Sequence, residues 1–321
     1  MGAKWDLALW FAGVAVLVLS GPLSAEDPYQ VAWSRQIGTS TIDRSYSVAV
    51  DVFGNAYIGG ITQGSLGGTS AGGVDNFLFK YDSDGNVLWS RQPGSTSSEY
   101  YGSVAVDSSG NAYLSGWTSG DLAADNAGGW DVFLVKYNSD GNVLWSRQTG
   151  SAGHDYVYAA TVDALGNAYI CGSTKGDLAA TNAGYDDVLL IKYNSAGDLL
   201  WSRQIGTPEV DEGRGVAVDA SGDVYVTGET SGNLARTRIG YDDDVFLLKY
   251  DPNGNLLWSR QTGTSEDDRG RSVAVDAPNN PLVSGYTLGS LGGPHLGHSD
   301  AFVIKYDASG NVIWSQQIGT S

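Results

Sequence analysis

Acidic residues that recur at a fixed interval are the first candidates for chemistry in this chain. Each lies ten residues beyond a tryptophan, in a loop that precedes a stretch such as SVAVD: Asp43, Glu99, Asp155, Asp211 and Asp268. A ring of five carboxylates would supply the oxygen ligands that a hard cation such as Ca²⁺ prefers. The alternative is that each carboxylate caps its own loop or meets a nearby arginine, and the sequence favours this structural role.

The turn at residues 82–86 reads DSDGN, which is similar to the beginning of a calcium-binding loop. The equivalent turns read NSDGN, NSAGD, DPNGN and DASGN, so the middle ligand is not kept. Tight hairpin turns explain every version, because the first side chain can bond the turn backbone and glycine adopts a positive φ at no steric cost. We therefore expect turn glycines such as Gly110 and Gly141 to be structural, and calcium stays only an alternative.

Histidine offers few candidates for catalysis or metal binding. His295 and His298 lie near Asp300 and could ligate zinc, but three ligands on one loop are weak support, and solvated loop histidines are the favoured interpretation. With three histidines in the chain and no Ser/His/Asp order, P-loop or CxxC motif, the sequence predicts no catalytic residue, no metal ligand and no cofactor.

Aromatic residues in the variable loops are candidates for ligand contacts. Tyr101, Trp117 and Tyr156 could stack on sugar rings or anchor a protein partner, and they are predicted ligand-binding residues together with the five recurring acidic positions. Trp130, Tyr185 and Tyr241 occupy related positions and are expected to pack at the edge of the core.

Composition and charge narrow the class of protein. The chain has 321 residues, 36 acidic against 18 basic, and a net charge of −18, which argues against nucleic-acid binding because phosphate contacts need clustered Lys and Arg. The lone Cys171 cannot form a disulfide within the chain. Residues 1–25 combine Lys4, an uncharged apolar run and small residues before Ala25, which is typical of a secretory signal peptide.

A repeat of 56 or 57 residues organises the rest of the chain. It is marked by tryptophans that open WSRQ or WSQQ and that we expect to be structural: Trp33, Trp89, Trp145, Trp201, Trp258 and Trp314. Between two tryptophans lie four short stretches rich in β-branched and aromatic residues and bounded by Gly, Asn and Asp, which predict four strands. The repeats are 33–88, 89–144, 145–200, 201–257 and 258–313, with a terminal strand at 314–321.

Repeats of four antiparallel strands without helices favour an all-β fold, a β-propeller of four-stranded blades within a single domain at 26–321. A parallel β-helix is the runner-up, but it would need shorter rungs. Counting strands gives twenty-one, one at Trp33 and four in each repeat, whereas a closed ring of five blades needs twenty. A closed five-bladed ring is favoured, and an open or truncated larger ring is the alternative.

A family resemblance follows from the pattern SVAVDxxGNxYxxGxT. It stands at Ser47–Thr62 and Ser103–Thr118 and returns in all five copies, which resembles the SBBP family, the bacterial seven-bladed β-propeller repeat. The fifth copy departs from it at Asp276–Thr287, which lacks the turn glycine and contains Pro281. The resemblance implies an exported repeat protein and no particular chemistry.

These observations predict an exported, non-enzymatic binding or scaffolding module, secreted or at the cell surface, with a protein or carbohydrate ligand. We expect a monomer with no nucleic-acid partner and no membrane span after signal cleavage. The alternative is an exported hydrolase or lyase that uses carboxylates at the channel mouth. An enzyme should place polar residues unique to single repeats around one end of the channel.

Overall fold

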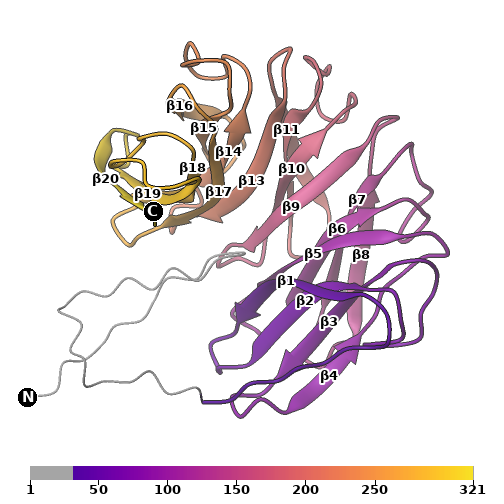
Figure 1. Cartoon of the computed structure of the whole chain (residues 1–321). Coiled ribbons are helices and arrows are strands. Elements are labelled where there is room, and N and C mark those ends of the chain that lie inside the picture. The colour runs from indigo at the N-terminus through magenta and orange to yellow at the C-terminus, as the bar shows by residue number, and fades with distance from the viewer. Residues whose placement is uncertain (1–31, 321) are drawn as a thin grey trace, which may run out of the picture.

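A computed structural model describes residues 32–320, so the expected signal peptide lies outside the described residues. The described part forms five antiparallel sheets of four strands each, in which strands follow one another in chain order (Figure 1). Within this part there is no helix with the length and apolar character that a membrane span requires. The predicted all-β propeller architecture of four-stranded blades is therefore confirmed.

Each sheet is built from strands of five to eight residues. In chain order the strands are β1 (Asp43–Val50), β2 (Ala56–Thr62), β3 (Asp75–Tyr81), β4 (Val87–Arg91), β5 (Glu99–Val106), β6 (Ala112–Thr118), β7 (Asp131–Tyr137), β8 (Val143–Thr149), β9 (Asp155–Val162), β10 (Ala168–Thr174), β11 (Asp187–Tyr193), β12 (Leu199–Ile205), β13 (Asp211–Val218), β14 (Val224–Thr230), β15 (Asp244–Tyr250), β16 (Leu256–Thr262), β17 (Asp268–Val275), β18 (Pro281–Thr287), β19 (Asp300–Tyr306) and β20 (Val312–Ile318).

The first two strands of each sheet are joined by a tight turn that one aspartate closes. Asp51 accepts two turn N–H groups, each at 2.9 Å, and Gly54 adopts a φ of 83°. In the fifth sheet Asn279 stands in place of this glycine, with a φ of 64°. Asp276 still accepts the N–H of Asn280 at 2.8 Å. Asparagine tolerates the left-handed region better than most residues. The fifth repeat therefore keeps this hairpin although its sequence departs from the repeat pattern.

The third strands lie in the middle of the core. Every residue of β3, β7, β11 and β15 is buried. Continuously apolar strands such as these are typical of strands that are covered on both faces. The fourth strands lie at the outer edge of each sheet and are more exposed. The first strands pack on one another around the centre, β1 on β5, β5 on β9, β9 on β13 and β13 on β17 (Figure 1).

Consecutive sheets pack face to face. We call the face that a sheet turns to the next sheet its forward face and the opposite one its rear face. On the forward face of the first sheet, Tyr57 and Leu78 meet Val104, Leu114 and Phe133 of the second sheet's rear face. Burial of such apolar side chains from both faces is what makes each sheet depend on its neighbours.

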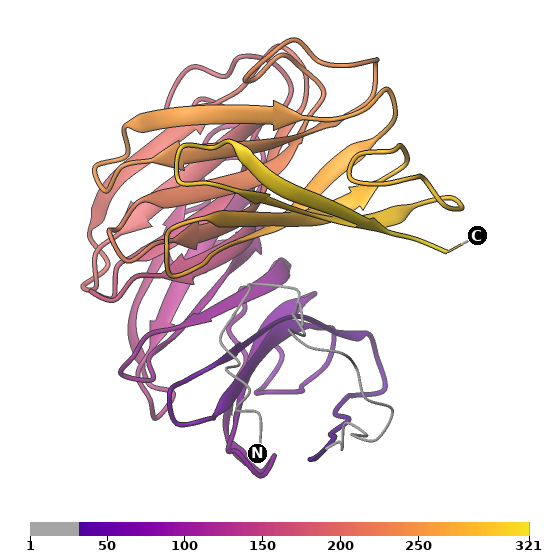
Figure 2. The same ribbon diagram turned by 90° about the vertical axis from the view of Figure 1, so that its left-hand side faces the viewer.

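The five sheets follow an arc whose two ends do not pack on each other. In residues 32–320, the strong packing between sheets joins only consecutive sheets, and β17 does not pack on β1 in this way. Figure 2 shows the last sheet, in yellow, opposite the first sheet, in indigo. Val48 on the rear face of the first sheet is 49% exposed, whereas its equivalent Val104 is 2% exposed. The structure thus supports the open ring rather than the favoured closed one.

The expected strand at Trp33 is not formed. The structure describes twenty strands, and residues 32–42 belong to none of them. This segment has no neighbouring strand of its own sheet to pair with, because the first sheet already ends in β4. It lies on the first sheet through side chains, as described below.

Candidate functional site

The residues that differ most between repeats meet at the centre of the arc. They come from the first half of the inner strands and from the last residues of the second strands, and we call them the inner-strand cluster. Its members are Tyr46, Tyr101, Trp117, Tyr156, Tyr158, Glu212, Arg214, Glu229, Arg271 and Tyr286. The structure thereby brings together Tyr101, Trp117 and Tyr156, three of the residues that the sequence predicted for ligand contacts.

The part of the cluster in the first three sheets is aromatic. The rings of Tyr46 and Tyr101 stack with their centroids 5.0 Å apart, and Tyr101 stacks on Trp117 at 5.5 Å. Trp117 meets Tyr156 edge to face at 5.5 Å and Tyr158 at 5.7 Å. Such contacts hold the rings in fixed orientations, which gives a preorganised apolar surface.

A local irregularity of β5 orients Tyr101. The pairing of β5 with β6 shifts register between Tyr100 and Ser103, and Tyr101 has a φ of 65°. A bulge turns a side chain away from its regular direction, and a tyrosine in the left-handed region is strained by about 1–3 kcal/mol. The side-chain amide of Asn76 donates to the carbonyl oxygens of Tyr101 and Gly60 and so holds the bulge from the neighbouring sheet.

The part of the cluster in the fourth and fifth sheets is charged. Arg214 bonds Glu229 at 3.0 Å and also Glu212, while Arg271 bonds the other oxygen of Glu229 at 3.1 Å. The guanidinium of Arg214 lies 4.0 Å from the ring centroid of Tyr158. The charged and aromatic parts therefore form one continuous surface across several sheets.

Glu229 is the most buried charged group of the cluster, with 2% of its side chain exposed. Burial raises the pKa of Glu229 to about 7, and the neighbouring Glu212 adds to this rise, while Arg214 and Arg271 oppose it. A carboxyl group that titrates near neutrality between two arginines can change the charge of this surface within the physiological range.

The repeats differ within the cluster at two positions, each of which is occupied by one residue from every repeat. One position in the second strands holds Ile61, Trp117, Ser173, Glu229 and Tyr286, and one in the inner strands holds Tyr46, Gly102, Tyr158, Arg214 and Arg271. Sequence reasoning missed Tyr158, Arg214, Glu229 and Arg271 as members of a site. An alignment of the five copies would have shown the second-strand column to vary between an invariant glycine and an invariant threonine, and the first half of the inner strands to vary from copy to copy.

The recurring acidic residues bind their own loops. Asp155 is fully buried, accepts the N–H of Ser151 at 2.6 Å and its hydroxyl at 3.0 Å, and is also bonded by Thr174. Its equivalents have matching serine or threonine partners: Asp43, Glu99, Asp211 and Asp268. Burial raises the pKa of Asp155 despite these hydrogen bonds. A role of these five residues in ligand or cation binding stays a prediction.

The other proposed metal positions are also engaged in local contacts. Asp82 accepts the backbone N–H groups of Asp84 and Asn86 at 3.0 and 2.8 Å. His295 Nδ1 lies 3.5 Å from a carboxylate oxygen of Asp300. In residues 32–320 no three or more His, Cys, Asp or Glu side chains are grouped so that they could hold a metal ion.

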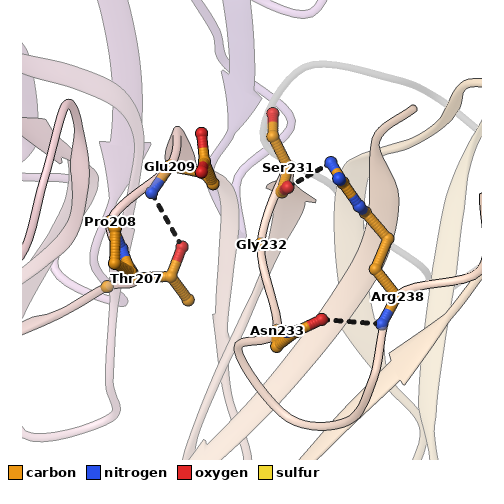
Figure 3. Close-up of a pocket in the computed structure, with 8 residues that line it drawn as sticks. Thr207, Pro208, Glu209, Ser231, Gly232, Asn233 and Arg238 are labelled. Atoms are coloured by element: carbon orange, nitrogen blue, oxygen red, sulfur yellow. Dashed lines mark hydrogen bonds between the residues drawn. The ribbon is translucent and has the colours of Figure 1, made fainter. Parts of the chain in front are cut away.

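A pocket of about 420 Å³ adjoins the ends of β13 and β14 near the charged part of the cluster (Figure 3). Its walls are the loop before β13, with Thr207, Pro208 and Glu209, and the loop after β14. Arg238 closes one side, donating its backbone N–H to Asn233 at 2.9 Å and its guanidinium to the carbonyl oxygen of Ser231. This pocket was not predicted from the sequence.

Two expected core residues lie in solvent. Tyr185 and Tyr241, expected to pack at the edge of the core, are exposed, and Tyr241 is 91% exposed. Trp130 instead packs on His154, with a centroid distance of 4.9 Å, and on Tyr156. The three residues stand at similar but not identical distances from the third strand, and only Trp130 directly precedes it.

Comparisons with known proteins agree with this architecture. The family model of the SBBP β-propeller repeat matches four segments of the chain, 32–67, 88–123, 144–179 and 200–235. The fifth sheet is not matched, although it has the same strand order.

Relatives with curated sequences cover most of this chain. The regulatory protein FlaEY of Caulobacter vibrioides is 25% identical over 288 residues, which cover 78% of this chain and 30% of that protein. An uncharacterized WD repeat-containing protein, L264 of Acanthamoeba polyphaga mimivirus, is 23% identical over 390 residues, covering 88% of this chain and 28% of that protein. The chain thus spans less than a third of the length of either relative.

Solved structures show a looser likeness. A subtype N10 neuraminidase-like protein of A/little yellow-shouldered bat/Guatemala/060/2010 is 12% identical with a TM-score of 0.47, and the match covers 86% of this chain and 81% of that one. The four matched repeats and the five four-stranded sheets together identify the chain as a β-propeller protein that carries four SBBP repeats.

Proposed function

We propose that this chain is an exported, non-enzymatic propeller module that holds a protein or glycan ligand on the inner-strand cluster at the cell surface. The observation that carries the proposal is the aromatic composition of the asymmetric cluster. Asymmetry alone would suit an active site as well, but six of the ten cluster residues are tyrosine or tryptophan. Repeats that are otherwise nearly uniform place Trp117, Tyr158, Arg214 and Glu229 at positions where the fold does not need these residue types.

The composition of the cluster supports binding. Tyrosine, tryptophan and arginine dominate the energetics of protein interfaces, and aromatic rings also stack on sugars. The cluster remains accessible, because Tyr46 is 36% exposed and the side chain of Arg271 is 33% exposed. Its residues stand on strands, which hold side chains more rigidly than loops do and so reduce the entropy lost on binding.

The ligand class can be found by screening two libraries with the wild type and two variants. A glycan array and a displayed peptide library are probed with the wild type and with Trp117→Ala, and Tyr241→Ala serves as the control because Tyr241 lies in solvent outside the cluster. We expect ligands that bind the wild type and the control but not Trp117→Ala. Ligands retained equally by all three proteins, or none in either library, would contradict the proposal.

A hydrolase or lyase is the second candidate, and the carboxyl groups of the cluster favour it. Glu229 has a pKa of about 7 and shares Arg214 with Glu212, so it can donate or accept a proton near neutrality. If the chain is an enzyme, Glu229→Gln will abolish turnover of a polysaccharide substrate while its binding persists. If it is a binding module, neither protein will release product from any glycan that binds.

A further inference from the structure

The four interfaces between consecutive sheets share one set of hydrogen bonds at their outer edge. A tryptophan of the fourth strand donates its indole N–H to a carbonyl oxygen in the last turn of the next sheet: Trp89 to Ser139 at 2.9 Å, Trp145 to Ser195 at 3.1 Å, Trp201 to Pro252 at 3.1 Å and Trp258 to Ala308 at 3.2 Å. The arginine two residues later bonds the glycine of the same turn.

Residues 33–35 make part of the same contacts on the rear face of the first sheet, with Arg35 bonding the residue before the turn glycine instead of the glycine itself. Trp33 donates its indole N–H to the carbonyl oxygen of Ser83 at 3.0 Å, and Arg35 donates to that of Asp84 at 3.4 Å. The ring of Trp33 stacks on Tyr81 with a centroid distance of 5.9 Å. A Cβ atom on Gly85 would lie only 2.6 Å from the Trp33 ring, so this glycine is needed for the contact.

Within residues 32–320 nothing else covers this rear face, because residues 33–35 replace only the outer strand of a preceding sheet. Val48, at the inner side, is exposed, whereas its equivalents Val104, Val216 and Val273 are buried in the interfaces between sheets. The first sheet therefore presents a partly covered half of an interface that the chain uses four times.

The forward face of the fifth sheet is the matching half. Trp314 is 39% exposed and, unlike Trp258, donates no hydrogen bond within residues 32–320. Ala301 is exposed, whereas its equivalents Val132, Val188 and Val245 are buried. The face lacks two donors of the other interfaces, because Leu282 replaces the tyrosine that bonds the next sheet and Gln316 replaces the arginine.

We propose that the forward face of the fifth sheet docks onto the first sheet of a second copy of this chain, with Trp314 taking the place of that copy's Trp33 at the Ser83 turn. The two faces are halves of one repeated contact, so the pairing is head to tail. Trp33 and Trp314 compete for one acceptor, and Leu282 and Gln316 make the new interface weaker than the internal ones. The association is therefore reversible, and residues 33–35 act as a displaceable cap.

The test measures the oligomeric state of the secreted full chain by sedimentation velocity over a thousandfold range of concentration. We expect the double variant Trp33→Ala/Arg35→Ala to associate at concentrations at least tenfold lower than the wild type, because the Ser83 turn is free. Adding Trp314→Ala to the double variant should return it to the monomer. Leu165→Ser, which changes an exposed leucine of the third sheet, is the control and should match the wild type.

Three results would overturn the proposal. The first is a double variant that is folded by circular dichroism and still sediments as a monomer throughout the range. The second is an association of the double variant that persists when Trp314 is replaced by alanine. A monomer whose radius of gyration shrinks and whose Trp314 becomes protected from solvent would instead show that the fifth sheet closes on the first sheet of the same chain.

Discussion

At the scale of single residues, Glu229 makes stability depend on pH. Its pKa is raised from 4.5 to about 7 by burial, so between these pH values the folded chain keeps a proton that the unfolded chain has lost. The stability contributed by this group is present below pH 4.5 and is lost as pH rises toward 7. Relative to Glu229→Gln, the wild type should lose on the order of 1–3 kcal/mol between pH 5 and pH 8.

Urea unfolding of both proteins at the two pH values checks this prediction. Because other carboxyl groups titrate in both proteins, only the difference between the two stabilities reports on Glu229. A difference that does not change with pH would show that Arg214 and Arg271 keep the carboxylate ionised throughout.

Two equivalent turn positions, Asn279 and Gly110, allow a second prediction at the scale of residues. Asn279 has a φ of 64° where the other four first turns have glycine, and Gly110 has a φ of 76°. Asn279→Gly should stabilise the chain by roughly 0.5–1 kcal/mol because glycine adopts this conformation without steric cost, and Gly110→Asn should destabilise it by a similar amount. Thermal melts of the two variants decide this, and equal shifts of the same sign would refute the explanation.

At the scale of elements, the stability lost when the tryptophan of a fourth strand is truncated should depend on the contacts that the next sheet makes with its ring. Trp145 packs on Tyr113 and Tyr193 and bonds Ser195, so Trp145→Ala should cost roughly 3–5 kcal/mol. Trp314→Ala should cost about 1 kcal/mol or less, because within residues 32–320 no further sheet packs on that ring, which is 39% exposed. Denaturant unfolding of the two variants measures the contrast, and similar losses would mean that the ring packs within its own sheet.

The strands themselves were predictable from short apolar stretches between Gly, Asn and Asp, because these patterns are local. The prediction of a strand at Trp33 was wrong for a nonlocal reason, because WSRQ pairs as a strand only where a third strand precedes it in the same sheet. The predictions for Tyr185 and Tyr241 were wrong for a similar reason, because an offset of one or two residues from the position of Trp130 is enough to leave the ring in solvent.

At the scale of the whole molecule, the period predicted the propeller, but it did not predict that the arc stays open. Closure depends on whether the fifth sheet can meet the first, and the replacements Leu282 and Gln316 stand in that sheet, whose sequence also departs from the repeat pattern at residues 276–287. The inner-strand cluster could be predicted in part, through Tyr101, Trp117 and Tyr156. Its charged half could not, because the paired strands β13 and β14 bring Arg214 to Glu229, but Tyr158 and Arg271 join them only when three sheets lie side by side.

Calcium should not stabilise the molecule. The carboxylates of the turns and of the recurring loop positions already accept hydrogen bonds from their own backbone, as Asp82 and Asp155 do. We expect the melting temperature to be unchanged between millimolar calcium and excess chelator. A rise of several degrees with calcium would reveal a site and favour a cation-binding role for the recurring acidic residues.

The proposed export of the chain can be checked by one measurement. Expressed with its native N-terminus in a secreting bacterial host, the protein should appear outside the cytoplasm, and its intact mass should correspond to cleavage after Ala25. A protein that keeps the full mass of 33.7 kDa and stays in the cytoplasm would contradict the proposed localisation.

The most direct test of the account is the affinity of the inner-strand cluster for a ligand from the glycan or peptide screen. Isothermal titration should give a dissociation constant for Trp117→Ala at least thirtyfold above the wild type, as expected for loss of a central aromatic anchor worth about 2 kcal/mol. Tyr241→Ala should bind like the wild type. Equal affinities of wild type and Trp117→Ala, with a loss only in Tyr241→Ala, would place the binding surface on the outer loops and contradict the account.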